Sequence, residues 1–166
     1  MKGCVFMKKI KRTLSVFLIL ILLTFCFVPM ASAEEAPVAE TKYGAVRGLY
    51  FNGGECYYGI PYAKATTGKL RFMPPQAPEK WEGVYNATKQ PKDPIQGSYS
   101  ASNQSEDSLK LNVWVPDTET NEPLSVMFWI YGGSYSSGGI NESYYDMAKM
   151  AKDTGSQSFA LIVNLL

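Results

Sequence analysis

Histidine is absent from the 166 residues of this sequence. That absence excludes a histidine general base or histidine metal ligand supplied by these residues, including a zinc site of the H-E-x-x-H type. Cysteine is scarce as well, and two of the three cysteines, Cys4 and Cys26, lie in a segment that we expect to be removed. Cys56 alone cannot form an internal disulfide, and we predict that it is a small buried strand residue. We therefore expect no metal and no cofactor.

Positive charge is also scarce once the first 33 residues are set aside. The whole sequence has a net charge of +1, but five of its 16 basic residues lie within the first 12 positions. The rest of the chain has 11 Lys and Arg against 15 Asp and Glu, a net charge of −4. No basic patch remains that would indicate nucleic acid or an anionic membrane surface as a partner.

The first 33 residues have the organisation of a secretory signal peptide. A basic start precedes the apolar stretch Thr13–Pro29, and Ala31-Ser32-Ala33 is the small-x-small pattern found before a cleavage site. The alternative is a membrane anchor, for which an apolar run of about 17 residues is at the short limit. We expect cleavage, a domain over residues 34–166 without membrane attachment, and a secreted, extracellular or periplasmic location.

The amino-terminal part of this domain reads as a small antiparallel hairpin. Thr41–Tyr50 has strand character, Asn52-Gly53-Gly54 suits a tight turn, and Glu55–Ile60 forms the returning strand. The proline-rich stretch Pro61–Lys92 has no clear periodicity, so we expect a surface segment held by its aromatic side chains. These side chains are Tyr62, Phe72 and Trp81.

The carboxyl-terminal part reads as strand, loop, helix and strand, which together form one parallel crossover unit. The preceding strand alternates, with Leu109, Leu111, Val113 and Val115 on one face. The unit consists of the strand Ser125–Ile130, a helix that begins at Asn141 or Ser143 and reaches about Asp153, and the strand Phe159–Val163. The helix is expected to pack through one face. That face contains Tyr144, Met147, Ala148 and Ala151.

The glycine-rich loop 131–139 between this strand and helix admits several chemical interpretations. A phosphate-binding loop would need a lysine where Gly139 stands, and the spacing of a dinucleotide-binding loop is not met. A nucleophile elbow would need G-x-S-x-G, but Ser134 has Ser136 two positions after it. The remaining interpretations are an oxyanion-hole loop, whose backbone N–H groups face a developing charge, and a flexible glycine-serine turn.

Four ordered segments resemble the type-B carboxylesterases, the family of cholinesterases and bacterial para-nitrobenzyl esterases. Tyr58–Ala63 is similar to F-x-G-I-P-Y-A, and Leu70-Arg71-Phe72 to the R-F-x-x-P stretch. Ser105–Val113 is similar to S-E-D-C-L-x-L-N-V, with Ser108 in place of the cysteine, and Trp129–Gly138 to W-I-[HY]-G-G-G-F-x-x-G. The resemblance runs from about Thr41 to Asn164 and implies the amino-terminal portion of an α/β-hydrolase fold, a mixed sheet with one crossover.

The resemblance also implies roles for individual residues. Gly133 and Ser134 would present the N–H donors of an oxyanion hole, and Gly132 would allow the turn. The family has glycine where Ser134 stands, so a positive φ at this position would strain the backbone but leave the N–H donor in place. Arg71 and Glu106 match a structural ion pair of the family, for which two solvated surface charges are the alternative. The expected substrate is a small-molecule ester.

The serine nucleophile, acid and histidine of the family do not appear in these 166 residues, so we expect a truncated domain that is inactive alone. The alternatives are a non-catalytic, cholinesterase-like binding module and a vestigial product. We also expect an open edge at the strand Ser125–Ile130, through which the chain could self-associate.

Overall fold

In the computed structural model, residues 35–97, 103–119, 122–134, 136–153 and 158–163 are described, the last range by its backbone alone. The chain divides by its internal contacts into residues 1–35 and residues 36–166. The expected signal peptide lies outside the described residues, and all the structure below belongs to the second unit. No helix among the described residues is long and apolar enough to cross a membrane.

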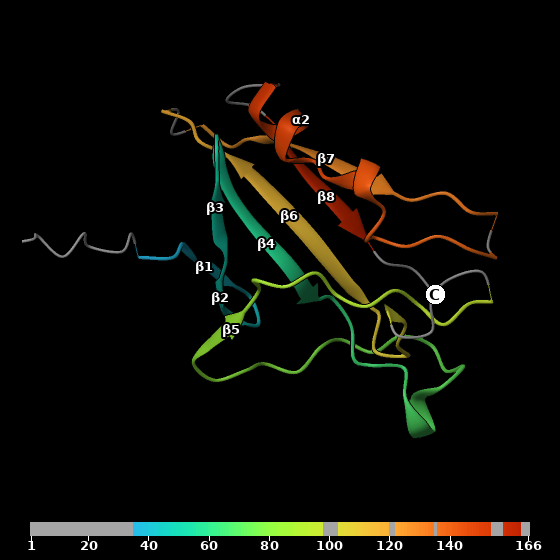
Figure 1. The fold of residues 1–166 in the computed structure, drawn as a ribbon. Coiled ribbons are helices and arrows are strands. Elements are labelled where there is room, and N and C mark those ends of the chain that lie inside the picture. Colours follow the sequence, from blue (N-terminus) through green and yellow to red (C-terminus); the bar gives the residue numbers. More distant parts are fainter. Residues whose placement is uncertain (1–34, 98–102, 120–121, 135, 154–157, 164–166) are drawn as a thin grey trace, which may run out of the picture. The chain divides into compact units, whose positions relative to one another are not determined.

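The larger sheet has five strands in the order β3-β4-β6-β8-β7 (Figure 1). These strands are β3 (Leu49–Phe51), β4 (Gly54–Pro61), β6 (Lys110–Pro116), β8 (Ser158–Val163) and β7 (Ser125–Ile130). All neighbours are antiparallel except β7 and β8, which are parallel. The predicted mixed sheet with one crossover is therefore confirmed, and so is the tight hairpin, which closes with Phe51 opposite Gly54.

The predicted strand Thr41–Tyr50 is wrong as a single element, because a turn and Gly48 divide it into three strands. The first two, β1 (Val38–Thr41) and β2 (Gly44–Arg47), join β5 (Val84–Asn86) in a separate sheet of order β1-β2-β5. The Oγ1 atom of Thr41 accepts a hydrogen bond from the N–H of Tyr43 (3.1 Å) and donates one to the carbonyl of Gly44 (2.7 Å). This local bonding competes with an extended strand and turns the chain.

The segment Pro61–Lys92 is more regular than predicted, since it contains the 3₁₀ turn η1 (Gly68–Leu70) and β5. Trp81 does hold it in place, with Nε1 donating to the carbonyl of Ala45 at 2.8 Å and the ring lying 5.4 Å from that of Tyr85. Phe72 does not, because it is 97% exposed at a φ of +59°. The expectation that all its aromatic residues hold this segment is therefore wrong at Phe72.

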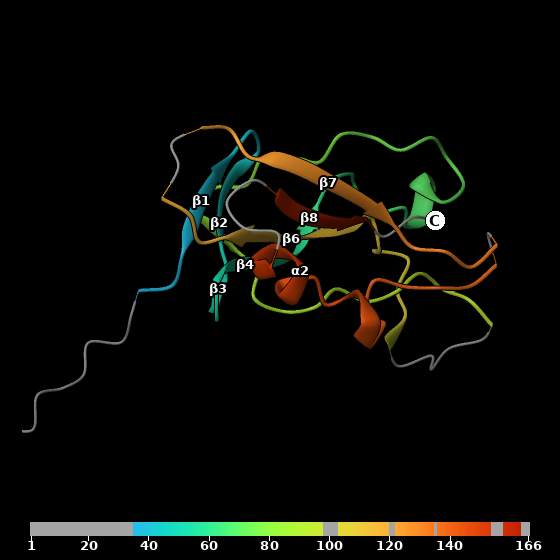
Figure 2. The same ribbon diagram turned by 90° about the horizontal axis from the view of Figure 1, so that it is seen from above.

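The two faces of β6 pack against different layers (Figure 2). On one face, Trp114 is buried with Cys56, and the cluster is completed by Ile140, Met147 and Ala151 from the segment that includes helix α2 (Ala148–Asp153). On the other, Val113 and Val115 pack against the cluster of Val46 from β2, Tyr57 from β4 and Ala87, which follows β5. The face predicted from the alternation thus exists, but the deeper burial lies on the opposite face, with Asn112 and Trp114.

The predicted helix is shorter than expected and begins later. A 3₁₀ turn, η3 (Ser143–Tyr145), precedes α2, and the Asp146 carboxylate accepts the N–H of Ala148 at 3.0 Å. This side chain therefore satisfies a free donor at the start of α2, in place of the predicted Asn141 or Ser143. Met147 and Ala151 are buried as predicted, whereas Tyr144, which lies in η3, is 69% exposed.

β7 lies at the edge of the larger sheet, and all six of its residues are exposed. The five apolar ones, Val126 to Ile130, are between 37% and 57% exposed, and none of the six is charged. The expected open edge is present in the described structure, and it lacks the lysine or proline that commonly blocks edge pairing. Self-association through this edge stays a prediction, which sedimentation at several protein concentrations would test.

Candidate functional site

The glycine-rich loop follows the last residue of β7, at the carboxyl end of a parallel strand pair, where ligands commonly bind in α/β sheets. Its backbone includes left-handed values of φ, +144° at Gly133, +54° at Ser134 and +115° at Gly138. A Cβ on Gly133 would overlap the carbonyl oxygen of Ser137, so only glycine fits this conformation. Ser134 does have the positive φ that would strain a residue other than glycine, at a cost of about 1–2 kcal/mol.

The hydrogen bonds of this loop leave two neighbouring donors open. The carbonyl of Gly133 accepts the N–H groups of Ser136 (3.0 Å) and Ser137 (3.1 Å) and the hydroxyl of Ser136 (3.1 Å). Within the described part of the chain, no group accepts a hydrogen bond from the N–H of Gly133 or Ser134. Two consecutive N–H groups held in a tight turn can bind a carbonyl oxygen or an oxyanion.

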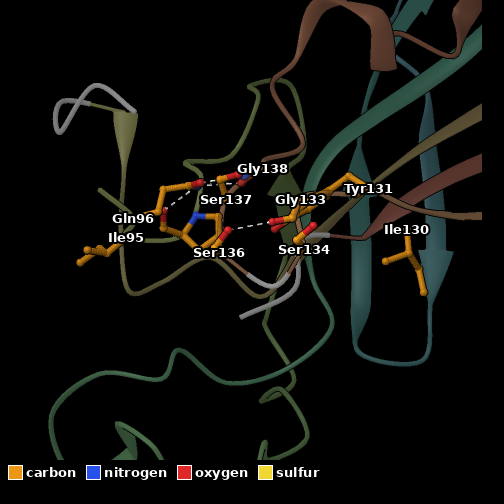
Figure 3. A pocket seen from close by; sticks show the side chains of 11 residues that line it. Ile95, Gln96, Ile130, Tyr131, Gly133, Ser134, Ser136, Ser137 and Gly138 are labelled. Atoms are coloured by element: carbon orange, nitrogen blue, oxygen red, sulfur yellow. Dashed lines mark hydrogen bonds between the residues drawn. The ribbon is translucent and has the colours of Figure 1, made fainter. Parts of the chain in front are cut away.

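The loop lines a pocket of about 500 Å³ (Figure 3). The other wall is Pro94–Gln96, and Ile130 and Tyr131 join it from β7 and the start of the loop. None of the described residues that line it is charged. Burial raises the pKa of nearby Tyr62 to about 12, so that phenol stays protonated at neutral pH. The pocket wall thus supplies hydrogen-bond donors and apolar surface but no general base.

A buried carboxylate fixes the chain on both sides of this pocket. Asp93 is 3% exposed, and its Oδ1 accepts from Nδ2 of Asn141 (2.9 Å), which comes shortly after the loop. Its Oδ2 accepts from Nδ2 of Asn103 (3.2 Å), and the backbones of Asp93 and Asn103 are bonded at 2.9 Å. A Cβ on Gly139 would overlap the Asp93 carboxylate, so the loop passes directly against it. Asp93 therefore ties three segments together.

Arg71 and Glu106, the second predicted pair, lie outside the residues that line the pocket. Arg71 Nη2 is 2.5 Å from Glu106 Oε1, and the Glu106 carboxylate raises the pKa of the guanidinium. The backbone carbonyl of Glu106 accepts the hydroxyl of Thr66 at 3.0 Å. Both side chains are at least partly solvated, 54% and 27% exposed, so the pair adds little to stability by itself. Its structural role stays a prediction.

The local sequence pattern indicates the glycines of the loop but not the residues whose hydrogen bonds fix the loop in place. Asp93 is hydrogen-bonded to Asn141, which lies 48 residues later, and Gln96 to Gly138, which lies 42 residues later. No short motif connects the members of these pairs. The composition of Gln96–Ser105 predicts a polar loop, and residues 98–102 of that stretch lie outside the described residues. Among the described residues, no group of three or more His, Cys, Asp or Glu side chains could hold a metal ion.

Comparison with known proteins gives a consistent result. The sequence model described as "Carboxylesterase family" matches residues 35–163. The para-nitrobenzyl esterase of Bacillus subtilis is 43% identical over 121 residues, which are 69% of this chain and 24% of that protein. The cholinesterase of Mus musculus is 36% identical over 159 residues, covering 86% of this chain and 26% of that protein.

Solved structures agree with the sequence comparison. A structure of PNB esterase matches with a TM-score of 0.71 and 39% identity, covering 78% of this chain and 27% of that one. A carboxylesterase of Geobacillus stearothermophilus matches with a TM-score of 0.68 and 38% identity, covering 76% and 26%. The chain thus spans about a quarter of the length of the relatives it matches.

Proposed function

Because the chain belongs to the carboxylesterase family, we propose that its glycine loop forms the oxyanion hole for hydrolysis of a carboxylic ester. The observation that carries this proposal is the pair of open N–H donors at Gly133 and Ser134, beside a pocket whose described lining residues are uncharged. A serine outside these 166 residues would attack the ester carbonyl. The resulting tetrahedral oxyanion would accept hydrogen bonds from these two N–H groups and from the N–H after that serine.

We assign the oxyanion donors to this chain, and the nucleophile and base to residues outside it, because of the groups that the chain contains. The donors are fixed before substrate arrives, so they stabilise the charge that develops in the transition state without reorganising. A nucleophile elbow and a histidine base are missing from the sequence. Loss of such groups lowers turnover by several orders of magnitude, even where oxyanion donors remain.

A chimera tests the proposal directly. Residues 35–163 replace the matching segment of the Bacillus subtilis para-nitrobenzyl esterase, which is 43% identical over the aligned region. We expect the chimera to hydrolyse a para-nitrobenzyl ester, because the donated segment supplies the oxyanion donors and the recipient supplies the nucleophile and base. The 166-residue chain alone should release product no faster than buffer.

Two results would contradict the proposal. One is a chimera that is monomeric and melts cooperatively but does not turn over ester. The other is hydrolysis by the 166-residue chain that a serine-directed phosphonate abolishes, which would place the whole reaction within these residues.

We further propose that residues 1–33 direct secretion and are removed after Ala33. The support is the basic, apolar and small-residue organisation of this segment. Expressed in a bacterium with a general secretion system, the chain should appear outside the cytoplasm with an amino terminus at Glu34. Intact-mass measurement would decide this, and a variant with Ala31 and Ala33 both changed to bulky Leu should keep its first 33 residues.

A further inference from the structure

Two glutamine side chains form consecutive hydrogen-bonded pairs that lead to the glycine loop, and Figure 3 shows the pair of Gln96 with Gly138. The amide of Gln96 pairs with the backbone of Gly138 in both directions: Nε2 donates to the carbonyl at 2.7 Å, and Oε1 accepts the N–H at 2.7 Å. The amide of Gln104 pairs in the same way with the backbone of Gln96. There Oε1 accepts the N–H at 3.0 Å, and Nε2 donates to the carbonyl at 2.9 Å.

Gly138 connects these two side-chain amides to the turn that contains the N–H donors of Gly133 and Ser134. A Cβ on Gly138 would crowd the carbonyl oxygen of Gly132 at 2.5 Å, so the two ends of the loop lie against each other. The residue after Gly132, Gly133, is bonded through its carbonyl to Ser136 and Ser137. A shift of Gly138 therefore displaces the turn that presents the N–H groups of Gly133 and Ser134.

Gln96 also lines the pocket, so it could instead bind the ligand itself. Its hydrogen-bonding capacity argues against that. An amide nitrogen carries two hydrogens, and Nε2 of Gln96 donates to Gly138 and, at 3.1 Å, to the carbonyl of Pro94. Both donors are used within the protein, and none is left for a carbonyl oxygen of a substrate.

We propose that Gln96 and Gln104 are positioning residues that set the oxyanion donors of Gly133 and Ser134 by clamping Gly138. The inference rests on the proposed function, because it concerns the donors of the same site. Neither glutamine touches the reacting atoms. Gln96 acts on the loop, and Gln104 acts on Gln96.

The test uses the full 166-residue chain labelled with ¹⁵N-glycine and ¹⁵N-serine, and butyrate as the probe for the donors. In the unaltered chain, butyrate should shift the amide signals of Gly133 and Ser134 saturably. Gln96→Met keeps the side-chain length and removes both halves of the clamp, so butyrate affinity should fall about fivefold or more. Gln104→Met should lower the affinity by a smaller factor, because it loosens Gln96 and not Gly138.

Gln76→Met is the matched control, since Gln76 is exposed and is not a lining residue. It should leave butyrate affinity and the urea midpoint unchanged. Butyrate affinity distinguishes a positioning role from a purely structural one. Loss of a purely structural clamp would change the urea midpoint and the protection of the Gly138 amide but not the affinity for butyrate.

Three results would overturn the inference. Butyrate affinity equal to that of the unaltered chain in Gln96→Met, with the Gly138 amide deprotected, would show that the clamp does not set the donors. If Gln96→Met does not fold, unchanged affinity in folded Gln104→Met leads to the same conclusion. Absence of any shift at Gly133 and Ser134 in the unaltered chain would refute the oxyanion site itself, and this inference with it.

Discussion

Replacing Gly133 by alanine should lower kcat of the active chimera by about 10²–10³, the usual loss when one oxyanion donor is misplaced. Gly133 has a φ of +144°, and the new Cβ would overlap the carbonyl oxygen of Ser137. The loop has to change its backbone conformation to relieve this overlap, and the N–H groups of Gly133 and Ser134 then move. KM should change little, because oxyanion donors act mainly on the transition state.

Gly132→Ala is the matched control, since among the described residues no atom beyond the chain neighbours of Gly132 lies within 4 Å of a Cβ placed there. It should keep most of the activity. Ser134→Gly should keep or raise activity, because it relieves the strain of a left-handed serine (φ +54°) and retains the N–H. Equal kcat values for Gly133→Ala and Gly132→Ala would show that the loop geometry does not serve the reaction.

Replacing Trp114 by alanine should lower the free energy of unfolding by about 3–5 kcal/mol, which is a large fraction of the stability of a typical domain. Trp114 is 1% exposed on β6, between β4 and β8, and it packs with Cys56, Met147 and Ala151. Its ring meets that of Tyr58 edge to face at 5.7 Å. Alanine would leave a cavity between the sheet and α2, which urea unfolding of the chain would detect.

Trp114→Phe distinguishes loss of the ring from loss of the indole N–H. Nε1 of Trp114 is buried and has no hydrogen-bond partner among the described residues. Phenylalanine removes this donor and retains most of the aromatic volume, so it should cost less than half as much as alanine. Equal losses for the two variants would show that the stabilisation does not come from the volume of the ring.

The strands are predictable where their pattern is local. The hairpin turn at Asn52-Gly53 and the apolar run Phe159–Val163 each contain their signal within a few residues, and both are elements of the sheet. The split of Thr41–Tyr50 is not predictable in this way. Gly48 lies where the chain passes from one sheet to the other, and a Cβ there would overlap the carbonyl of Cys56.

The candidate site likewise contains residues that the local sequence predicts and residues that it does not. Gly132, Gly133 and Ser134 are predicted from the loop's resemblance to a family, because the residues that carry this resemblance are adjacent in the sequence. Asp93 and Gln96 carry no such signal. Their importance depends on Asn141 and Gly138, which are 48 and 42 residues away and become neighbours only in the folded chain.

The sequence by itself indicated the family, through four ordered segments that resemble it. It also indicated the parallel crossover unit and the place of the glycine-rich loop, since these depend on hydrophobic periodicity and on the position of glycines along the chain. Only the tertiary structure decided which face of β6 is the deeper core and which side chains fix the loop. The physical reason is that burial and hydrogen-bond pairing are properties of surfaces and atoms brought together by folding. The residues that supply them can be far apart along the chain.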